Sequence, residues 1–144
     1  WRIGYSASNP QLAKVMANYL SHSTSAPSTI SQQAAITALT GPQEDMQVMK
    51  QAFEQRRDHL VERMNKIEGV SCIKPEGAFY LFVKAPEPDE KAFCARAQKH
   101  NLLLVPGSSF ACPGYVRIAY CVSENQITRA MSAFEALAQE YGLV

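Results

Sequence analysis

The sequence predicts a small domain of the α/β or α+β class, with helices packed on a small mixed sheet. From residue 70 onward the expected elements follow the order strand, strand, helix, strand, strand, helix. A long amphipathic segment over residues 43–67 precedes them, and the chain before it reads as the end of a larger α/β domain. We therefore place a domain boundary near Pro42, between residues 1–42 and residues 43–144.

The first forty residues predict a short strand and two helices. The opening WRIGYSAS indicates a strand over residues 2–7, already in mid-course, so we expect the chain to be a fragment of a longer protein. A helix follows Pro10, and a second helix runs from about residue 28 to residue 39 before Gly41-Pro42 ends it. The first helix carries an apolar stripe at helical spacing, formed by Leu12, Val15, Met16, Tyr19 and Leu20.

Residues 43–67 predict one long helix, because its apolar residues lie three, four or seven positions apart and Gly69 stops it. Strands are expected next over residues 70–74 and 78–83. The second of these is apolar on both faces, which is typical of a central strand.

The last part of the chain alternates again between strand and helix. A short helix is expected over residues 89–100, followed by a buried strand, LLLV, over residues 102–105. The segment GYVRIAYC (114–121) predicts the next strand, and Ser123 with Gln126 forms a capping box that opens the closing helix.

Composition excludes several classes of partner. The 144 residues are 47% hydrophobic and carry a net charge of +1, which gives no electrostatic argument for nucleic acid or an anionic membrane. No apolar run approaches the roughly 20 residues that span a bilayer. The four cysteines are widely spaced and form no C-x-x-C pair, so we interpret them as free thiols in a reducing compartment, the cytoplasm.

Arg117 is the first candidate site residue, because it stands in the middle of an apolar strand. An ionised arginine is rarely buried unless it is paired. Its partner is either a structural carboxylate elsewhere in the fold or an anionic ligand, and strand geometry leaves both open. Arg2, in WRIGY, poses the same choice, with phosphate added.

Other catalytic signatures are missing from the residues. The three histidines have no metal-ligand spacing, and the sequence has no Ser/His/Asp motif, no glycine-rich phosphate loop and no paired-carboxylate signature. Composition and spacing alone predict only a soluble α/β domain with one or two anion-binding arginines.

Several strings together carry a family resemblance: WRIGY, SHSTSAPSTISQQAA, KPEGAFYLF, LLLVPGSSF and GYVRIAYC, in that order. The chain resembles the C-terminal third of a class I, fold type I, pyridoxal-phosphate-dependent aminotransferase, closest to the bacterial aspartate enzymes. The resemblance covers essentially all 144 residues. It implies the C-terminal part of a PLP-dependent transferase fold and a homodimer.

The resemblance also implies roles for four residues. Arg117 would hold the substrate α-carboxylate, Arg2 the phosphate of pyridoxal 5′-phosphate, and Phe79 would line the substrate pocket. Ser25 would reach the active site of the other subunit, although Ala26 stands where the family pattern has Asn. The lysine that carries the cofactor would precede Trp1, so we expect no catalytic residue in this chain and no activity from the chain alone.

The implied reaction transfers an amino group from an L-amino acid, aspartate first, to 2-oxoglutarate. Three alternatives stay open at this point. The enzyme could act on another amino acid, the chain could be an aminotransferase-like effector domain of a transcription regulator, or it could be a structural domain with Arg117 in a buried ion pair.

Overall fold

The computed structural model describes residues 2–143, which divide into two compact units. Unit 1 ends at Gln47 and unit 2 begins at Val48, within helix α3 (Glu44–Met64). The domain boundary expected near Pro42 concerns the whole protein and stays a prediction.

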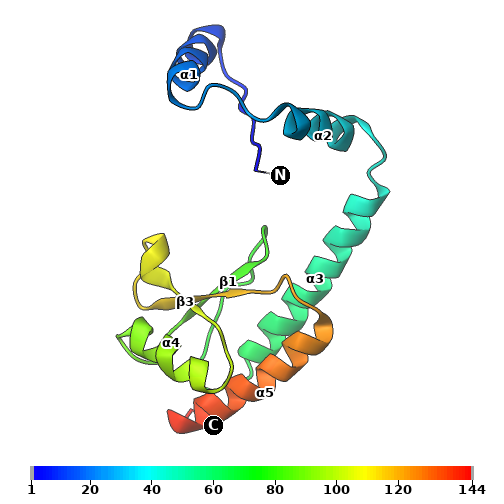
Figure 1. Cartoon of the computed structure of the whole chain (residues 1–144). Helices are drawn as coiled ribbons and strands as arrows, with labels where there is room; N and C mark the ends of the chain where they lie inside the picture. Colours follow the sequence, from blue (N-terminus) through cyan, green and yellow to red (C-terminus); the bar gives the residue numbers. More distant parts are fainter. Residues whose placement is uncertain (1, 144) are drawn as a thin grey trace. The chain divides into compact units, whose positions relative to one another are not determined.

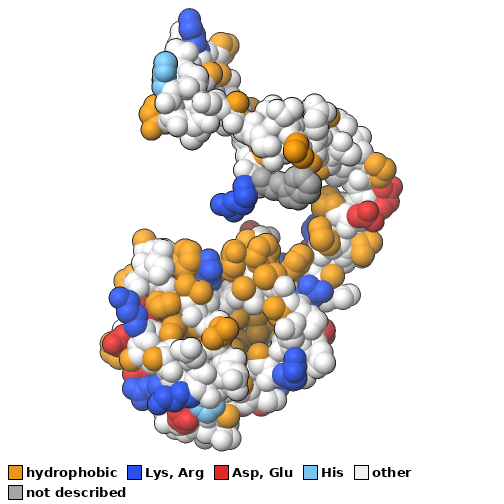
Figure 2. All heavy atoms as spheres, viewed as in Figure 1, with side chains coloured by type: hydrophobic (Ala, Val, Ile, Leu, Met, Phe, Trp, Pro, Cys, Tyr) orange, Lys and Arg blue, Asp and Glu red, His pale blue; other side chains and the backbone are white. Residues whose placement is uncertain are grey.

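Unit 1 consists of two helices, α1 (Pro10–Ser23) and α2 (Thr29–Thr40). The side chain of Asn9 caps α1 by accepting a hydrogen bond from the backbone N–H of Leu12 at 2.9 Å. The apolar stripe of α1 is exposed, and Figure 2 shows hydrophobic side chains on the surface of this helix. The strand expected over residues 2–7 is wrong, because a strand needs a pairing partner and these residues pair with no other described segment.

Helix α3 confirms the expected long helix but ends at Met64 rather than Ile67. Glu44 and Asp45 stand in its first turn, where negative charge offsets the helix dipole. Gly69 follows with a φ of +73°, a conformation that glycine adopts without strain.

The sheet of unit 2 has three strands in the order β1-β3-β2: β1 (Tyr80–Lys84), β2 (Val105–Pro106) and β3 (Tyr115–Ala119). Both pairings are antiparallel, so the sheet is not mixed as expected. The central strand is β3, not the residue 78–83 segment, and Figure 1 shows β1 beside it. In this register Arg117 lies opposite Phe82 on one side and Val105 on the other.

Two expected strands are shorter than the sequence indicated. Residues 70–74 contribute only an isolated bridge between Cys72 and Val83, because the N–H of Cys72 donates to the side chain of Asn65 instead. The LLLV strand is reduced to Val105–Pro106. The N–H of Leu102 donates to the carbonyl of Ala97 and so completes the end of helix α4 (Glu90–Lys99). Residues before Val105 are therefore not available to pair with β3.

The hydrophobic core lies on one face of the sheet, which we call the covered face. The end of α3, α4 and α5 (Glu124–Glu140) supply its helical layer, and Figure 1 shows α4 and α5 on the same side of the strands. The Ser123–Gln126 capping box is present at the start of α5, as expected. The strands contribute four side chains to this core, Leu81, Val83, Val116 and Ile118, and Tyr120 adds a fifth directly after β3.

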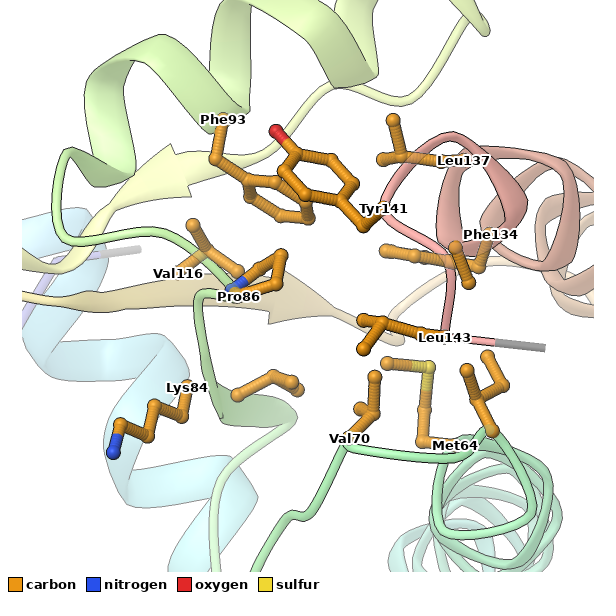
Figure 3. A pocket seen from close by; sticks show the side chains of 13 residues that line it. Met64, Val70, Lys84, Pro86, Phe93, Val116, Phe134, Leu137, Tyr141 and Leu143 are labelled. Carbon is orange, nitrogen blue, oxygen red and sulfur yellow. The ribbon is translucent and has the colours of Figure 1, made fainter.

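The packing of this core leaves a cavity of about 30 Å³, which is the space of a single water molecule. Figure 3 shows the apolar side chains of Phe93, Phe134 and Leu143 converging on it from α4, α5 and the C-terminal turn. The lining is almost wholly apolar, so we assign this cavity to packing and not to ligand binding.

Candidate functional site

The opposite face of the sheet, which we call the open face, carries Arg117. Successive strand residues alternate between faces, so the buried side chains of Val116 and Ile118 place Arg117 on the other side. Tyr80 and Phe82 of β1 share that face with it, since Leu81 and Val83 point into the core. The open face has no helical layer among the described elements.

Two aromatic rings hold the guanidinium group of Arg117. Its central carbon lies 4.2 Å from the ring centroid of Tyr80 and 4.1 Å from that of Phe110. Phe110 is the last residue of a short 3-10 helix, η1 (Gly107–Phe110), between β2 and β3. Its ring also meets Phe82 edge to face, with centroids 6.0 Å apart. The cation is therefore held by ring faces, a favourable arrangement for a delocalised charge.

Arg117 has no carboxylate partner among residues 2–143. Three other arginines of unit 2 form ion pairs: Arg57 with Asp58, Arg63 with Glu135 and Arg96 with Glu87. The Nε atom of Arg117 is buried and has no hydrogen-bond partner. Of the buried side-chain nitrogen and oxygen atoms in the described residues, this one alone has no partner. The two Nη atoms form no hydrogen bond with a described residue, so they are the donors that a ligand could use.

The loop that carries Phe110 has a tightly defined shape. A methyl group on Gly107 would overlap the carbonyl oxygens of Cys112 and Tyr115, so this position admits only glycine without a shift of the backbone. Ala111, which ends η1, has a φ of 56°, an unusual conformation for alanine.

A buried carboxylate, that of Glu90 in the first turn of α4, anchors the same loop to this helix. Glu90 accepts a hydrogen bond from the backbone N–H of Gly114 at 3.2 Å, and the hydroxyl of Ser108 lies near the same carboxylate. The Ser108 hydroxyl is the main cause that lowers the pKa of Glu90 below its ordinary value, and the backbone donors add to it. The ionised carboxylate therefore favours the observed loop.

An open groove of about 440 Å³ adjoins the ring of Tyr80. Tyr80, Phe82 and Tyr115 form its aromatic part, and Lys84 adds a cation that pairs with no carboxylate within the described residues. Arg117 does not line this groove, but the ring of Tyr80 both lines it and holds the guanidinium of Arg117. A cation close to an apolar and aromatic surface suits an organic anion better than an inorganic one.

The structure places the other predicted site residues in different surroundings. Phe79 precedes β1, and its ring stacks on that of Phe53 from α3, with centroids 5.8 Å apart. The ring next to Arg117 is that of Tyr80, which in turn touches Phe79 at 4.6 Å. Arg2 and Ser25 belong to unit 1, where both adopt positive φ values, 64° and 63°. The roles expected for these residues stay predictions.

Sequence reasoning missed Tyr80 and Phe110 as neighbours of Arg117. The strand alternation of β1 could have placed Tyr80 on the same face as Arg117 once the pairing was known. Phe110 lies on a loop with no periodicity, so only the folded structure reveals its contact.

No group of three or more potential metal ligands occurs within residues 2–143. His59 pairs with Glu124 and His100 with Glu140, so each of these histidines has a carboxylate neighbour. None of the helices described is both long and apolar enough to cross a membrane.

Comparison with known proteins assigns the chain to a family. The family model for aminotransferases of class I and II matches residues 1–134. The chain is 42% identical to the aspartate aminotransferase of Geobacillus stearothermophilus over 139 residues, which cover 91% of this chain and 35% of that protein. It therefore spans about a third of the length of this curated relative.

Solved structures agree with this assignment. The aspartate aminotransferase of Thermotoga maritima matches with a TM-score of 0.86 and 38% identity, over 96% of this chain and 36% of that one. The aromatic aminotransferase of Pyrococcus horikoshii matches with a TM-score of 0.87 and 30% identity, over 100% of this chain and 40% of that one. The chain belongs to the class I and II aminotransferase family.

Proposed function

We propose that this chain is the C-terminal part of a pyridoxal-phosphate-dependent aminotransferase, and that Arg117 binds the α-carboxylate of its substrates. The observation that carries the proposal is a guanidinium fixed between two aromatic rings, without any carboxylate partner in residues 2–143. A purely structural arginine would be expected to have an acidic partner. This favours the anion-binding interpretation over the buried ion pair.

We infer aspartate as the first substrate to test and 2-oxoglutarate as the acceptor. Aspartate aminotransferases are prominent among the relatives, but the aromatic enzyme that matches this chain shows that the fold also serves other amino acids. An α-carboxylate is common to all these substrates. Arg117 would therefore serve the amino acid and the oxo acid alike, and the side chain would be selected elsewhere.

The described residues fit one part of the cofactor. Arg2 is exposed and forms no ion pair with a described carboxylate, so its guanidinium is free to bind a phosphate group. When bound, pyridoxal 5′-phosphate supplies the electron sink that lets the α-proton of an amino acid be moved. The lysine that would carry the cofactor and the group that would move the proton are not assigned to any residue of this chain.

The contribution of this chain to catalysis is then orientation. A bidentate carboxylate held by Arg117 has a fixed position, and a fixed substrate reacts faster because the entropy of alignment is lost on binding. The homodimer, with Ser25 at the partner's site, and the substrate-pocket role of Phe79 are further parts of the proposal.

The test uses the complete enzyme that contains this chain. The visible absorption spectrum with pyridoxal phosphate is recorded before and after aspartate is added, for the wild type and for Arg117→Met. The expected result is a spectral conversion in the wild type and a requirement for at least tenfold more aspartate in the variant, since a lost charged hydrogen-bond pair costs roughly 1.5–3 kcal/mol. Arg129→Ala, a change at an exposed arginine on α5, is the matched control and should behave as wild type.

Each outcome decides something different. Conversion with another amino acid but not with aspartate would reject only the substrate. Binding of the cofactor without conversion by any amino acid would favour the regulatory effector domain. Equal aspartate requirements for the wild type and Arg117→Met would reject the role of Arg117.

A further inference from the structure

We propose that Phe110 and Tyr80 are positioning residues for Arg117, which hold its guanidinium so that both Nη atoms face the substrate carboxylate. The inference rests on the proposed function, since it takes the ligand of Arg117 to be a carboxylate. It adds two residues, one of them on a loop, to the machinery that orients the substrate.

Aromatic rings are suited to this task because they attract a cation without accepting its hydrogen bonds in place of the ligand. A carboxylate beside Arg117 would hold the guanidinium equally well but would occupy the donors that the substrate needs. The rings of Tyr80 and Phe110, at 4.2 and 4.1 Å, hold it through their faces instead. The two Nη atoms therefore form no hydrogen bond with a described residue and are free to donate to a ligand.

The buried Nε atom indicates the direction of binding. A carboxylate can meet a guanidinium either along the edge formed by Nε and one Nη, or end-on through both Nη atoms. The Nε atom of Arg117 is shielded and has no partner among the described residues, so the first edge is closed. We infer end-on binding through Nη1 and Nη2.

The loop between β2 and β3 is built to keep Phe110 in place. Gly107 allows the close approach to Cys112 and Tyr115, while Glu90 ties the loop to α4 through Ser108 and Gly114. Left-handed alanines stand beside both ring-bearing segments: Ala111 follows Phe110, and Ala78 lies two residues before Tyr80 with a φ of 58°. Such conformations persist only where the surroundings determine them.

Phe110 is also open to substitution. Its side chain is 44% exposed, so replacing it by leucine removes the ring at small cost to folding. Phe110→Tyr keeps the ring and is the conservative control. Tyr80→Phe likewise keeps the ring and loses only the hydroxyl, whereas Tyr80→Leu removes the second ring.

The experiment measures ligand binding and turnover in the complete enzyme. Isothermal titration with succinate, a dicarboxylate that has no amino group to transfer, gives the Kd, and steady-state assays give KM and kcat. Phe110→Leu is expected to raise the Kd for succinate and the KM for aspartate about three- to thirty-fold, with kcat changed much less. Phe110→Tyr and Tyr80→Phe should stay within about twofold of wild type, and Tyr80→Leu should resemble Phe110→Leu. Thermal unfolding of each variant checks that it is folded.

Two results would overturn the positioning role while the proposed function stands: loss of succinate binding in Arg117→Met but not in Phe110→Leu, or equal weakening by Phe110→Leu and Phe110→Tyr. Succinate binding that does not respond to Arg117→Met would overturn the proposed function, and the positioning role with it. Weakening by both ring-removing variants with rescue by the ring-keeping ones supports the inference.

Discussion

The two faces of strand β3 are formed by the same five residues, but one face is packed in the core and the other carries a cation. On the covered face, Val116 is 1% exposed and Ile118 is 9% exposed under the helical layer. On the open face, Arg117 is held by rings, and its buried Nε atom has no hydrogen-bond partner among the described residues. Burial therefore stabilises the fold on one face, while the other face holds a cation without a carboxylate partner among the described residues, which we propose is a binding group.

The largest effect should come from the covered face. Met131 of α5 is fully buried, so Met131→Ala should lower the free energy of unfolding by about 2–5 kcal/mol through lost transfer energy and a new cavity. Amide hydrogen exchange of α5 in the complete enzyme measures the loss. Met131→Leu, which nearly conserves volume, should cost less than about 1.5 kcal/mol.

This prediction also separates the two faces. Below its unfolding temperature, Met131→Ala should bind succinate with the wild-type Kd, because Met131 does not contact the open face. A weaker Kd in a folded Met131→Ala variant would mean that the faces are coupled through the sheet.

A smaller effect is expected at the loop that supplies Phe110. The pKa of Glu90 is lowered in the folded state, chiefly by the Ser108 hydroxyl, so its ionised form is favoured by folding. Because the pKa of Glu90 is lower in the folded state, the ionised carboxylate stabilises the loop at pH values above 4.5, the pKa in the unfolded state. This stabilisation is lost as the pH falls from 4.5 through the lower pKa of the folded state.

The measurement is the protection of the Gly114 amide, which donates to Glu90, corrected for intrinsic exchange at each pH. Protection should fall below about pH 4.5 in the wild type. Glu90→Gln should show lower protection at neutral pH and a flat profile in the acid range. An equally steep profile in both proteins would assign the pH dependence to another group.

Much of the fold followed from local signals in the sequence. Helix starts were marked by Pro10 and by the Ser123 capping box, and the structure confirms both. Such signals act within a few residues and do not depend on what packs against the helix. That independence explains why α1 could be predicted although its apolar stripe is exposed in unit 1.

Strands were predicted less well because they depend on partners distant in the sequence. LLLV has high strand propensity, yet Leu103 is 83% exposed because residues 100–102 complete the C-terminal cap of α4. The segment 2–7 has no pairing partner among the described residues, so its pattern alone could not make it a strand.

The candidate site was predicted in part for the same reason. An arginine in an apolar strand pointed to Arg117 directly, and alternation placed it on the face opposite Val116. The rings that hold it come from a neighbouring strand and from a loop, which no periodicity in the sequence connects to Arg117. Contacts of this kind depend on register and on loop shape, and only the folded chain defines them.

The smallest effect on stability should come from the open face itself. Arg117→Met keeps the length and apolar stem of the side chain between Tyr80 and Phe110, but it loses the cation–π attraction, which contributes about 0.5–2 kcal/mol. It also removes a buried donor without a partner, whose burial costs about 1–3 kcal/mol. The two terms oppose each other, so the thermal midpoint of the complete enzyme should stay unchanged or rise, while succinate binding is lost. A variant that loses both binding and several degrees of thermal stability would show that Arg117 is a structural residue, and the contrast between the two faces of β3 would then disappear.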